Sequence, residues 1–527
     1  MSENLDMSNL PFLCVAQIIF ELSDSSADLH SCLLVNRMWC KCAVAYLWRT
    51  PFYWNGHRAV KMVIEFLRLL PNDCLEDLEY VIGIHIPAQN MQPMFNYLSF
   101  VRTMNIMCCI EAVECFLADY FDIVNDTDIR LLSLRICRGM VKNCPLLMEI
   151  DMAGHDIGYY GYKWTARSWN LFNLKDSVTN INQLKQLRFS QEFPPDILYS
   201  AAEKLSNLEL FEIAWSENCM YIDGIKWCDA ISKLIGNQKS LKVAYLNLNF
   251  SFFGTNLKSI CKALYTQAKT LIKVKILFAG TEISKLIDTF GQLAKLHYIK
   301  LVYCTLSPTC PLELPPDAFS NLRVLKINEI ETNFYGIDAL LGNVKECLET
   351  LCICYIEMNA DYNAELWRKC AKNAPNLSYL KIQLDLEDYV QFIQMALPLW
   401  QNLRKLCIVI NEPHNNKDSH ELLSNILSLA GTNLPASVKF LKLDAYCKLP
   451  LAAFTTFLST CSASLESFSL RVDDLNDSLV NTLLDYMGNS LQSVYLKGTG
   501  ALSAETKAKL NTQIPRVDYF MKSVNSD

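Results

Sequence analysis

Residues 322–327 read "LRVLKI", and the spacing of their apolar residues, L-x-x-L-x-L, recurs along the chain and decides its fold. The run "LHYIKL" from Leu296 precedes it and "LETLCI" from Leu348 follows it. Twelve such runs begin between Leu184 and Leu491, about 28 residues apart on average. The segments between them, such as "HELLSNILSLAG", carry apolar residues at the intervals of an amphipathic helix. Each unit therefore predicts a strand, a loop, a helix and a return loop.

A single unit of this kind cannot bury its own leucines. Stacked units can, because neighbouring strands form a parallel sheet that helices cover on one side. The pattern resembles the longer, helix-bearing leucine-rich repeats, and the resemblance covers roughly residues 180–515. It implies an α/β horseshoe with the parallel sheet on the concave face and the helices on the convex face. An ordinary open α/β sheet is the alternative, although twelve parallel strands at such regular spacing would be unusual for it.

The repeats depart from the family pattern at one position. Many leucine-rich repeats place Asn or Cys four residues after the third leucine-type position, where the side chain hydrogen-bonds neighbouring loops. Cys304 and Asn411 fit, but Glu192, Ser216 and Ile330 occupy this position in other repeats. We therefore expect an irregular horseshoe.

The first 52 residues concentrate large apolar side chains in short helical patterns, as in "VAQIIFEL" and "LHSCLLVNRMWCKCAVAYLW". Pro11 can open the first helix at its first turn. Three helices this short make a core too small to bury every large apolar residue, so the surplus has to meet a partner. The alternative is a cap that closes one end of the solenoid, which every solenoid needs.

The same segment resembles an F-box, in particular that of fungal F-box proteins with C-terminal leucine-rich repeats. The gap between Leu10-Pro11 and Ile19-Phe20 is one residue longer than the commonest family spacing. The resemblance implies docking to a Skp-family adaptor of a cullin–RING ubiquitin ligase of the SCF type. The residues that it assigns to adaptor binding are Leu10, Pro11, Ile19, Phe20, Leu22, Leu33, Val35, Trp39, Leu47 and Trp48.

These two resemblances divide the chain into four parts. Residues 6–54 are expected to form the F-box and residues 181–515 the leucine-rich-repeat solenoid. Residues 55–180 are expected to form degenerate early repeats, with "LEDLEYVIGIHI" and "LLMEIDMAG" as weak strands. Residues 516–527 are expected to be a C-terminal tail.

Composition narrows the class of protein. The chain has 527 residues, 51% of them apolar, and a net charge of −7, which argues against nucleic-acid binding as the main role. Its 22 cysteines are expected to be reduced, because no signal peptide opens the sequence and many lie in apolar runs. The apolar run "LPFLCVAQIIF" is too short to span a bilayer. We expect a protein of the cytoplasm, the nucleus or both, without a membrane partner.

No motif points to catalysis. Phosphate loops, nucleophile elbows and zinc-protease motifs are missing from the sequence, and so is any C-x-x-C pair. We therefore expect no metal, no cofactor and no enzymatic activity. An enzyme with a site in the loop "GHDIGYYGYKW", Gly154 to Trp164, is a distant alternative.

The strand alternation predicts which side chains face the concave surface. The fifth position of each repeat places Lys275, Lys300 and Lys326 on neighbouring strands about 4.8 Å apart. We hypothesise that this face binds an acidic or phosphorylated segment of a target protein. The alternative is that the lysines only keep an exposed sheet soluble. The residues assigned to target binding are Lys273, Lys275, Tyr298, Lys300, Lys326, Tyr379, Lys381, Lys405, Phe440 and Lys442.

The sequence thus predicts a substrate receptor of an SCF-type ubiquitin ligase. In this role the N-terminal segment holds the adaptor and the repeats hold an unknown target. The competing prediction is a leucine-rich-repeat interaction scaffold without a ligase role, whose N-terminal helices are only a cap.

Overall fold

The structure is a computed structural model, in which the chain divides into two compact units, Met1–Tyr245 and Leu246–Asp527. We describe each unit by itself. The described residues are 11–53, 57–71, 93–119, 121–122, 124–153, 169–173, 181–214, 223–248, 257–277, 283–304, 314–330, 340–356, 363–384, 386–410 and 417–522.

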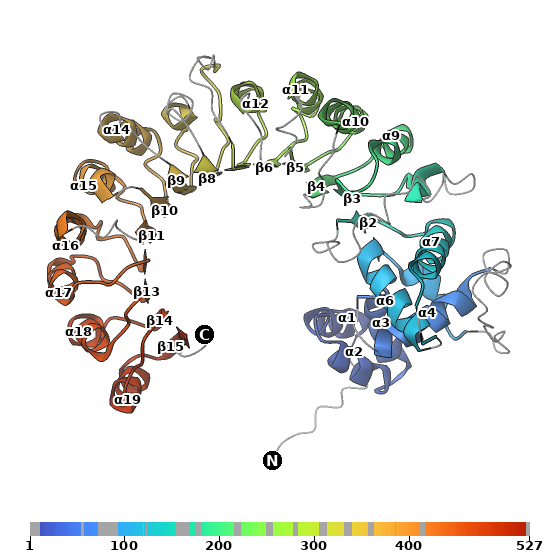
Figure 1. Cartoon of the computed structure of the whole chain (residues 1–527), viewed down its shortest axis with the longest axis horizontal. Coiled ribbons are helices and arrows are strands. Elements are labelled where there is room, and N and C mark those ends of the chain that lie inside the picture. The colour runs from blue at the N-terminus through green and yellow to red at the C-terminus, as the bar shows by residue number, and fades with distance from the viewer. Residues whose placement is uncertain are drawn as a thin grey trace. The chain divides into compact units, whose positions relative to one another are not determined.

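The first unit opens with helices and continues with strands that alternate with helices (Figure 1). Its helical start consists of α1 (Phe12–Glu21), α2 (Ser26–Leu33), α3 (Arg37–Leu47) and α4 (His57–Leu69). The elements that follow are η3 (Tyr97–Phe100), β1 (Thr103–Asn105), α6 (Ile106–Ala118), α7 (Asp126–Asn143), β2 (Glu149–Met152), η6 (Leu171–Asn173), β3 (Gln186–Ser190), α9 (Pro195–Lys204), β4 (Leu210–Ala214) and α10 (Gly224–Gly236). Strand β5 (Val243–Asn247) crosses the boundary between the units in the sequence.

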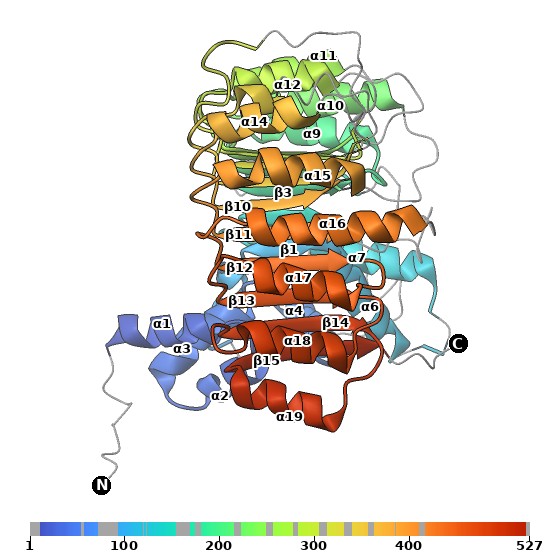
Figure 2. The same cartoon turned by 90° about the vertical axis from the view of Figure 1, so that its left-hand side faces the viewer.

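The second unit repeats one strand and one helix more regularly. Figure 2 shows its later helices stacked across the layer of strands. Its first half consists of α11 (Leu257–Thr266), β6 (Lys273–Leu277), α12 (Ile283–Gly291), β7 (Tyr298–Val302), β8 (Val324–Ile330), β9 (Thr350–Ile356), α14 (Asn363–Asn373), β10 (Tyr379–Gln383), α15 (Leu386–Met395) and η8 (Leu397–Leu399). Its second half consists of β11 (Lys405–Ile410), α16 (Lys417–Asn433), β12 (Phe440–Ala445), α17 (Leu451–Thr460), β13 (Ser467–Val472), α18 (Asp477–Met487), β14 (Ser493–Thr499), α19 (Ala504–Gln513) and β15 (Arg516–Lys522).

Within each unit the strands pair in parallel and in chain order. The leucine-type residues of the repeats are buried, whereas the residues that alternate with them in each strand are partly exposed. In β7, for example, Ile299 and Leu301 are buried, and Tyr298 and Lys300 are partly exposed. The predicted α/β fold with a repeated parallel sheet is confirmed, and each of the twelve predicted runs contributes a strand. In the second unit, the strands line the inner side of a curve and the helices the outer side (Figure 1).

A backbone pattern fixes the step from one repeat to the next. The carbonyl of the residue before a strand accepts two N–H groups from the next repeat. The His297 carbonyl, for example, accepts from Arg323 and Val324 at 2.9 Å each. One acceptor therefore serves two donors at the start of each strand, and the register cannot slip without losing both hydrogen bonds.

The asparagine ladder lies before the strands rather than after them. Asn321 Nδ2 donates to the Ala294 carbonyl at 2.8 Å, and Asn402 Nδ2 donates to the Pro375 carbonyl at 3.2 Å. Each of these asparagines directly precedes the first leucine of its repeat. At the position where the family pattern places its ladder, Cys304 is buried, and its thiol donates to the carbonyl of Val302 in its own repeat. Asn411 and Ser216 lie outside the described residues.

The structure adds strands at both ends of the predicted repeats. Residues 516–522, assigned to a tail from the sequence, form β15, which pairs with β14 over its whole length. The run "RVDYFMK" lacks the leucine spacing, so the repeat pattern does not predict a strand there. The weak strand in "LLMEIDMAG" forms β2, whereas "LEDLEYVIGIHI" lies outside the described residues.

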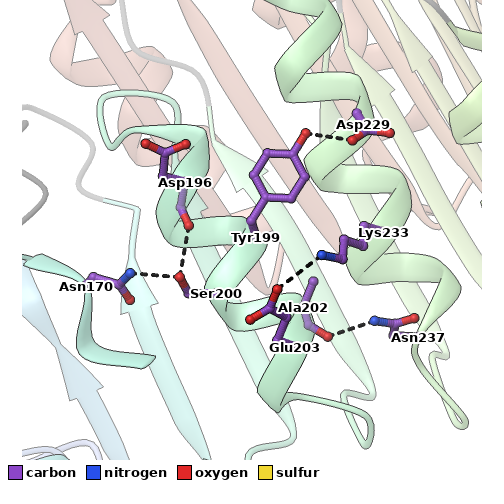
Figure 3. A network of polar contacts seen from close by, with 9 residues as sticks. All are labelled: Asn170, Asp196, Tyr199, Ser200, Ala202, Glu203, Asp229, Lys233 and Asn237. Atoms are coloured by element: carbon purple, nitrogen blue, oxygen red, sulfur yellow. Dashed lines mark hydrogen bonds and ion pairs between the residues drawn. The ribbon is translucent and has the colours of Figure 1, made fainter. Parts of the chain in front are cut away.

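Polar contacts join consecutive helices of the first unit (Figure 3). Tyr199 on α9 donates its hydroxyl to a carboxylate oxygen of Asp229 on α10 at 2.7 Å, and Asn237 Nδ2 donates to the Ala202 carbonyl at 2.8 Å. Burial and the neighbouring Asp229 raise the pKa of Tyr199 above its ordinary value, so the hydroxyl remains a donor. These contacts join neighbouring helices of the helix layer. They do not involve the exposed side chains of the strands.

Candidate functional site

The N-terminal helices are held by caps and by a small core of their own. The Asn36 side chain begins α3 by accepting the N–H groups of Met38 and Trp39 at 2.9 and 3.0 Å. Ser25 begins α2 in the same way, by accepting the N–H of Asp28. Helices α1 and α2 both pack against α3, and the side chains buried between them include Val15, Ile19, Leu29, Trp39 and Leu47.

This helical segment continues directly into the repeats of the first unit. The Arg49 carbonyl accepts the N–H groups of Arg102 and Thr103 at 2.9 and 3.0 Å, the two-donor pattern that joins later repeats. Beyond α3, the Trp48 ring lies 4.7 Å from that of Tyr97, and the Phe52 ring lies 5.5 Å from that of Phe66. The segment therefore covers the first strand, as a solenoid cap must.

The residues assigned to adaptor binding fall into distinct groups. Ile19, Trp39, Leu47 and Trp48 are buried and cannot contact a partner in this conformation. Short helices have few large side chains with which to build a core, and these residues fill it. Leu22 and Leu33 are half-buried, Pro11, Phe20 and Val35 are exposed, and Leu10 lies outside the described residues.

Three exposed side chains were missed by the sequence assignment. Phe12 is 54% exposed, Leu13 is 79% exposed and Leu34 is 88% exposed. Leu13 and Phe20 share one side of α1, because residues about seven apart return to nearly the same direction on a helix, and Phe12 adjoins Leu13 at the helix start. Leu34 adjoins Val35 in the turn between α2 and α3. The signal available in the sequence was that Leu13 lies off the face defined by Val15 and Ile19. We call these exposed side chains the apolar surface: Phe12, Leu13, Phe20, Leu34 and Val35.

The second candidate surface is the open face of the strands in the second unit. The register places Lys275, Lys300 and Lys326 side by side on β6, β7 and β8, as the sequence predicts. Lys381 and Lys442 continue the same column on β10 and β12. Cys352 on β9 lies between Lys326 and Lys381, and Cys407 on β11 lies between Lys381 and Lys442. Both thiols are buried, although their strand positions face the open side.

The second column of this face brings cations to aromatic rings. Lys273 Nζ lies 4.8 Å from the ring centre of Tyr298, and Lys326 Nζ lies 5.9 Å from the same centre. Further along, Tyr379, Lys405 and Phe440 are neighbours in register on β10, β11 and β12. The structure therefore brings all ten predicted target-binding residues onto one face of the second unit.

The lysines differ in their electrostatic surroundings. Lys442 pairs with the buried Asp444 at 2.8 Å. Burial, followed by Lys275 and Lys326, lowers the pKa of Lys300 below its ordinary value. In the described part of the chain, no carboxylate lies within 4 Å of Lys300 or Lys326. Among the described residues, a carboxylate therefore pairs with the lysine of this column on β12, and none pairs with those on β7 and β8.

The described residues hold no group of three or more metal-binding side chains. Among the same residues, none of the helices is long and apolar enough to cross a membrane. The loop from Gly154 to Trp164, the distant alternative for an enzyme site, lies outside the described residues.

A comparison with models of known protein families finds no match, and a comparison with curated proteins finds none either. Among solved structures, the chain is similar to a chain in the crystal structure of the Rad7 and Elc1 complex in yeast. The sequence identity is 14% and the TM-score is 0.32, over 61% of this chain and 78% of the other.

Proposed function

We propose that this chain is a substrate receptor of an SCF-type cullin–RING ubiquitin ligase, without catalytic activity of its own. The observation that carries the proposal is the apolar surface of the N-terminal helices, whose five side chains are 52–88% exposed. The motif in residues 8 to about 52 resembles an F-box. That resemblance supplies the partner, a Skp-family adaptor.

Energetics favour a docking role for this surface. Burying one large apolar side chain contributes about 1.5–3 kcal/mol, so a few of them suffice to anchor a specific interface. The helices that carry the surface are capped and packed on their own core, so little ordering is needed when a partner binds.

The repeats would hold the target in this arrangement. The receptor does no chemistry, and it acts by raising the effective concentration of target lysines near the charged ubiquitin carrier. The described cysteines are free thiols, as suits the cytoplasm or the nucleus, where we place the protein.

A second candidate function has its own supporting observation. The Arg49 carbonyl, Trp48 and Phe52 join the helices to the first repeats, as expected for a scaffold whose helices are only a cap. Capping uses the buried side chains and leaves the five exposed ones without a role. The two functions can therefore be separated by substituting exposed residues alone.

The test is a quantitative pull-down of a purified Skp-family adaptor by the full chain. A Phe20→Asp, Val35→Asp variant changes only exposed side chains, whereas a Trp39→Ala change would damage the core. The matched control is Ile225→Asp, Leu451→Asp, which alters two exposed apolar residues outside the segment.

We expect the wild-type chain and the control to bind, and the Phe20→Asp, Val35→Asp variant to bind about 100-fold more weakly. Failure of the folded wild-type chain to bind would overturn the ligase proposal and leave the scaffold. Equal binding by the Phe20→Asp, Val35→Asp variant would show that the apolar surface does not bind the adaptor.

A further inference from the structure

The last strand, β15, leaves one edge of the sheet open (Figure 1). Strand β14 pairs with it from Arg516 to Lys522, and no described strand pairs with its other side. The N–H of Arg516 donates to the Gln492 carbonyl at 3.2 Å, so the backbone groups of Arg516 point toward β14. Successive residues of a strand point these groups to opposite sides, so those of Val517 and Tyr519 point outward. An open edge of this kind can pair with another strand.

The apolar side chains of β15 are also incompletely covered. In register, Val517 and Tyr519 take the positions of Val494 and Leu496 in β14, which are 2% and 0% exposed. Val517 is only half-buried, and Tyr519 is 44% exposed. The Lys507 ammonium group on α19 lies 5.8 Å from the centre of the Tyr519 ring. The last described repeat therefore lacks the neighbour that covers the equivalent apolar residues in earlier repeats.

The charges of β15 favour a second copy of the same strand as the partner. Arg516 and Asp518 are both exposed and, being two residues apart, lie on the same side of the strand. Arg516 Nε lies 3.4 Å from a carboxylate oxygen of Asp518. A second β15 that runs antiparallel, with Val517 opposite Val517, places each Arg516 opposite the Asp518 of the other copy. Opposite charges in such cross-strand pairs are favourable.

Two other antiparallel alignments would also join the outward backbone groups, and charge disfavours both of them. With Val517 opposite Tyr519, the Asp518 residues of the two copies face each other. With Tyr519 opposite Tyr519, Arg516 faces Lys522, another cationic residue. Like charges directly opposite one another destabilise a pair of strands. Charge therefore selects the alignment about Val517.

The backbone suits the alignment about Val517 as well. The two Val517 residues would exchange N–H and C=O groups across a twofold axis. Each Tyr519 N–H would meet the Pro515 carbonyl of the other copy. In an earlier repeat, Glu466 stands at the place of Pro515, and its carbonyl accepts two N–H groups from the following repeat. Pro515 has no N–H of its own, so this residue leaves no donor unpaired.

We propose that two copies of this chain associate through β15, antiparallel about Val517, so that their sheets become continuous across a twofold axis. Both copies contribute the same residues, so the association closes at two chains. A contact of one strand from each copy is small, and we expect a monomer at about 1 µM and a dimer at about 200 µM. The inference goes beyond the ligase proposal and does not depend on it, because β15 and the apolar surface are formed by different residues.

The experiment is sedimentation equilibrium of the full chain at concentrations from about 1 to 200 µM. The test variants are Arg516→Asp and Asp518→Arg, measured separately and as an equimolar mixture. The matched control is Arg323→Asp, which alters an exposed arginine that also pairs with a carboxylate, that of Glu349. A further variant, Val517→Pro, removes an outward N–H and keeps the N–H groups that point toward β14, which an edge strand tolerates.

We expect each charge variant alone to associate at least about tenfold more weakly than the wild-type chain, and Val517→Pro at least about 30-fold more weakly. The control should stay within about threefold of the wild-type chain. The mixture of Arg516→Asp with Asp518→Arg should associate within about threefold of the wild-type chain, because each cross-strand pair again joins opposite charges. Recovery in the mixture would also show that both variants are folded.

Three outcomes would overturn the proposal. A folded wild-type chain that remains a monomer at the highest concentration would leave the edge of β15 to a different partner. Association that Val517→Pro does not weaken would place the contact between copies elsewhere. A mixture that associates no better than its two components would contradict the pairing of Arg516 with Asp518.

Discussion

The open faces of strands β2–β4 and of strands β6–β8 use the same backbone pattern and treat charge in opposite ways. In the first unit, Arg188 lies 3.5 Å from Glu149 and 3.6 Å from Glu212, one carboxylate on each neighbouring strand. In the second unit, Lys275, Lys300 and Lys326 take the equivalent neighbouring positions. The first face pairs its charges within the chain, whereas the open face of β6 to β11, which we call the lysine face, carries lysines and, among its described residues, no Asp or Glu.

The pairing of the open side chains indicates which strands of a repeat protein are candidates for a binding site. Repeats fix the positions of the open side chains, so the choice of side chain determines what each position does. Around Arg188, further polar contacts complete the network: Asn105 Nδ2 donates to Asp151 at 3.1 Å, and Thr103 donates its hydroxyl to Glu149 at 3.3 Å. The charged groups around Arg188 are therefore paired with one another.

The largest expected effect comes from breaking the compensated face. Arg188→Glu would place a third negative side chain between Glu149 and Glu212, both of which are more than half buried. We expect the free energy of unfolding to fall by about 2–3 kcal/mol, measured by urea denaturation. The control is Arg323→Glu at an exposed pair with Glu349, which should change stability by less than about 0.5 kcal/mol. Equal effects of the two changes would contradict the contrast between the faces.

The next effect concerns salt. If the lysine face binds an acidic or phosphorylated target segment, raising the NaCl concentration from about 50 to 300 mM should weaken binding of the peptide Gly-Asp-pSer-Asp-pSer-Asp-pSer-Gly roughly tenfold. Adaptor binding through the apolar surface should change by less than about twofold, because apolar burial is not screened. Parallel titrations of both ligands measure the difference. Peptide binding that is insensitive to salt would assign it to other residues.

A smaller effect of opposite sign is expected at Lys300. Lys300→Gln removes one of three neighbouring positive charges, so we expect a gain of about 0.5–1 kcal/mol in the free energy of unfolding at neutral pH. The folded state lowers the pKa of Lys300, through burial first and then its lysine neighbours. The charged form therefore costs stability in full below the folded pKa, and this cost disappears as the pH rises from the folded pKa to the ordinary value.

The difference in stability between wild type and Lys300→Gln should accordingly narrow above neutral pH. Unfolding curves at three pH values between 7 and about 10 would measure it. A loss of stability at neutral pH would mean that Lys300 is compensated in the folded chain.

The smallest effect is expected at the thiols of the same face. Burial raises the pKa of Cys407 to about 12, the Asp444 carboxylate adds to the rise, and Lys442 and Lys381 oppose it. Cys352 and Cys407 should remain unmodified when the native chain is treated with iodoacetamide at pH 8, whereas the exposed Cys347 reacts. Mass spectrometry of the digested protein gives the extent of labelling. Rapid labelling of Cys407 would show that the lysine face opens.

The sequence predicts the repeats well, because burial of leucines forces their spacing. The same spacing places Lys275, Lys300 and Lys326 in register, so this part of the candidate site follows from the sequence alone. β15 does not, because its residues lack the leucine pattern and its pairing with β14 comes from the stacking of the preceding repeats.

The exposure of individual side chains could not be predicted from the sequence. Tryptophan is common in protein interfaces, but Trp39 and Trp48 are buried in the core. Phe12 and Leu34 are residue types typical of a core, but both are exposed. Cys352 and Cys407 occupy positions on the open side of their strands and are nevertheless buried. Each of these outcomes depends on side chains that are distant in the sequence, so the local pattern does not encode them.

We expect one chain to hold an adaptor and an anionic target segment at the same time. Native mass spectrometry of the full chain mixed with a purified Skp-family adaptor and the same triply phosphorylated peptide measures this. We expect a 1:1:1 complex that loses only the adaptor in Phe20→Asp, Val35→Asp and only the peptide in Lys275→Gln, Lys300→Gln, Lys326→Gln. Binary complexes that exclude one another, or a chain that binds neither ligand, would contradict it.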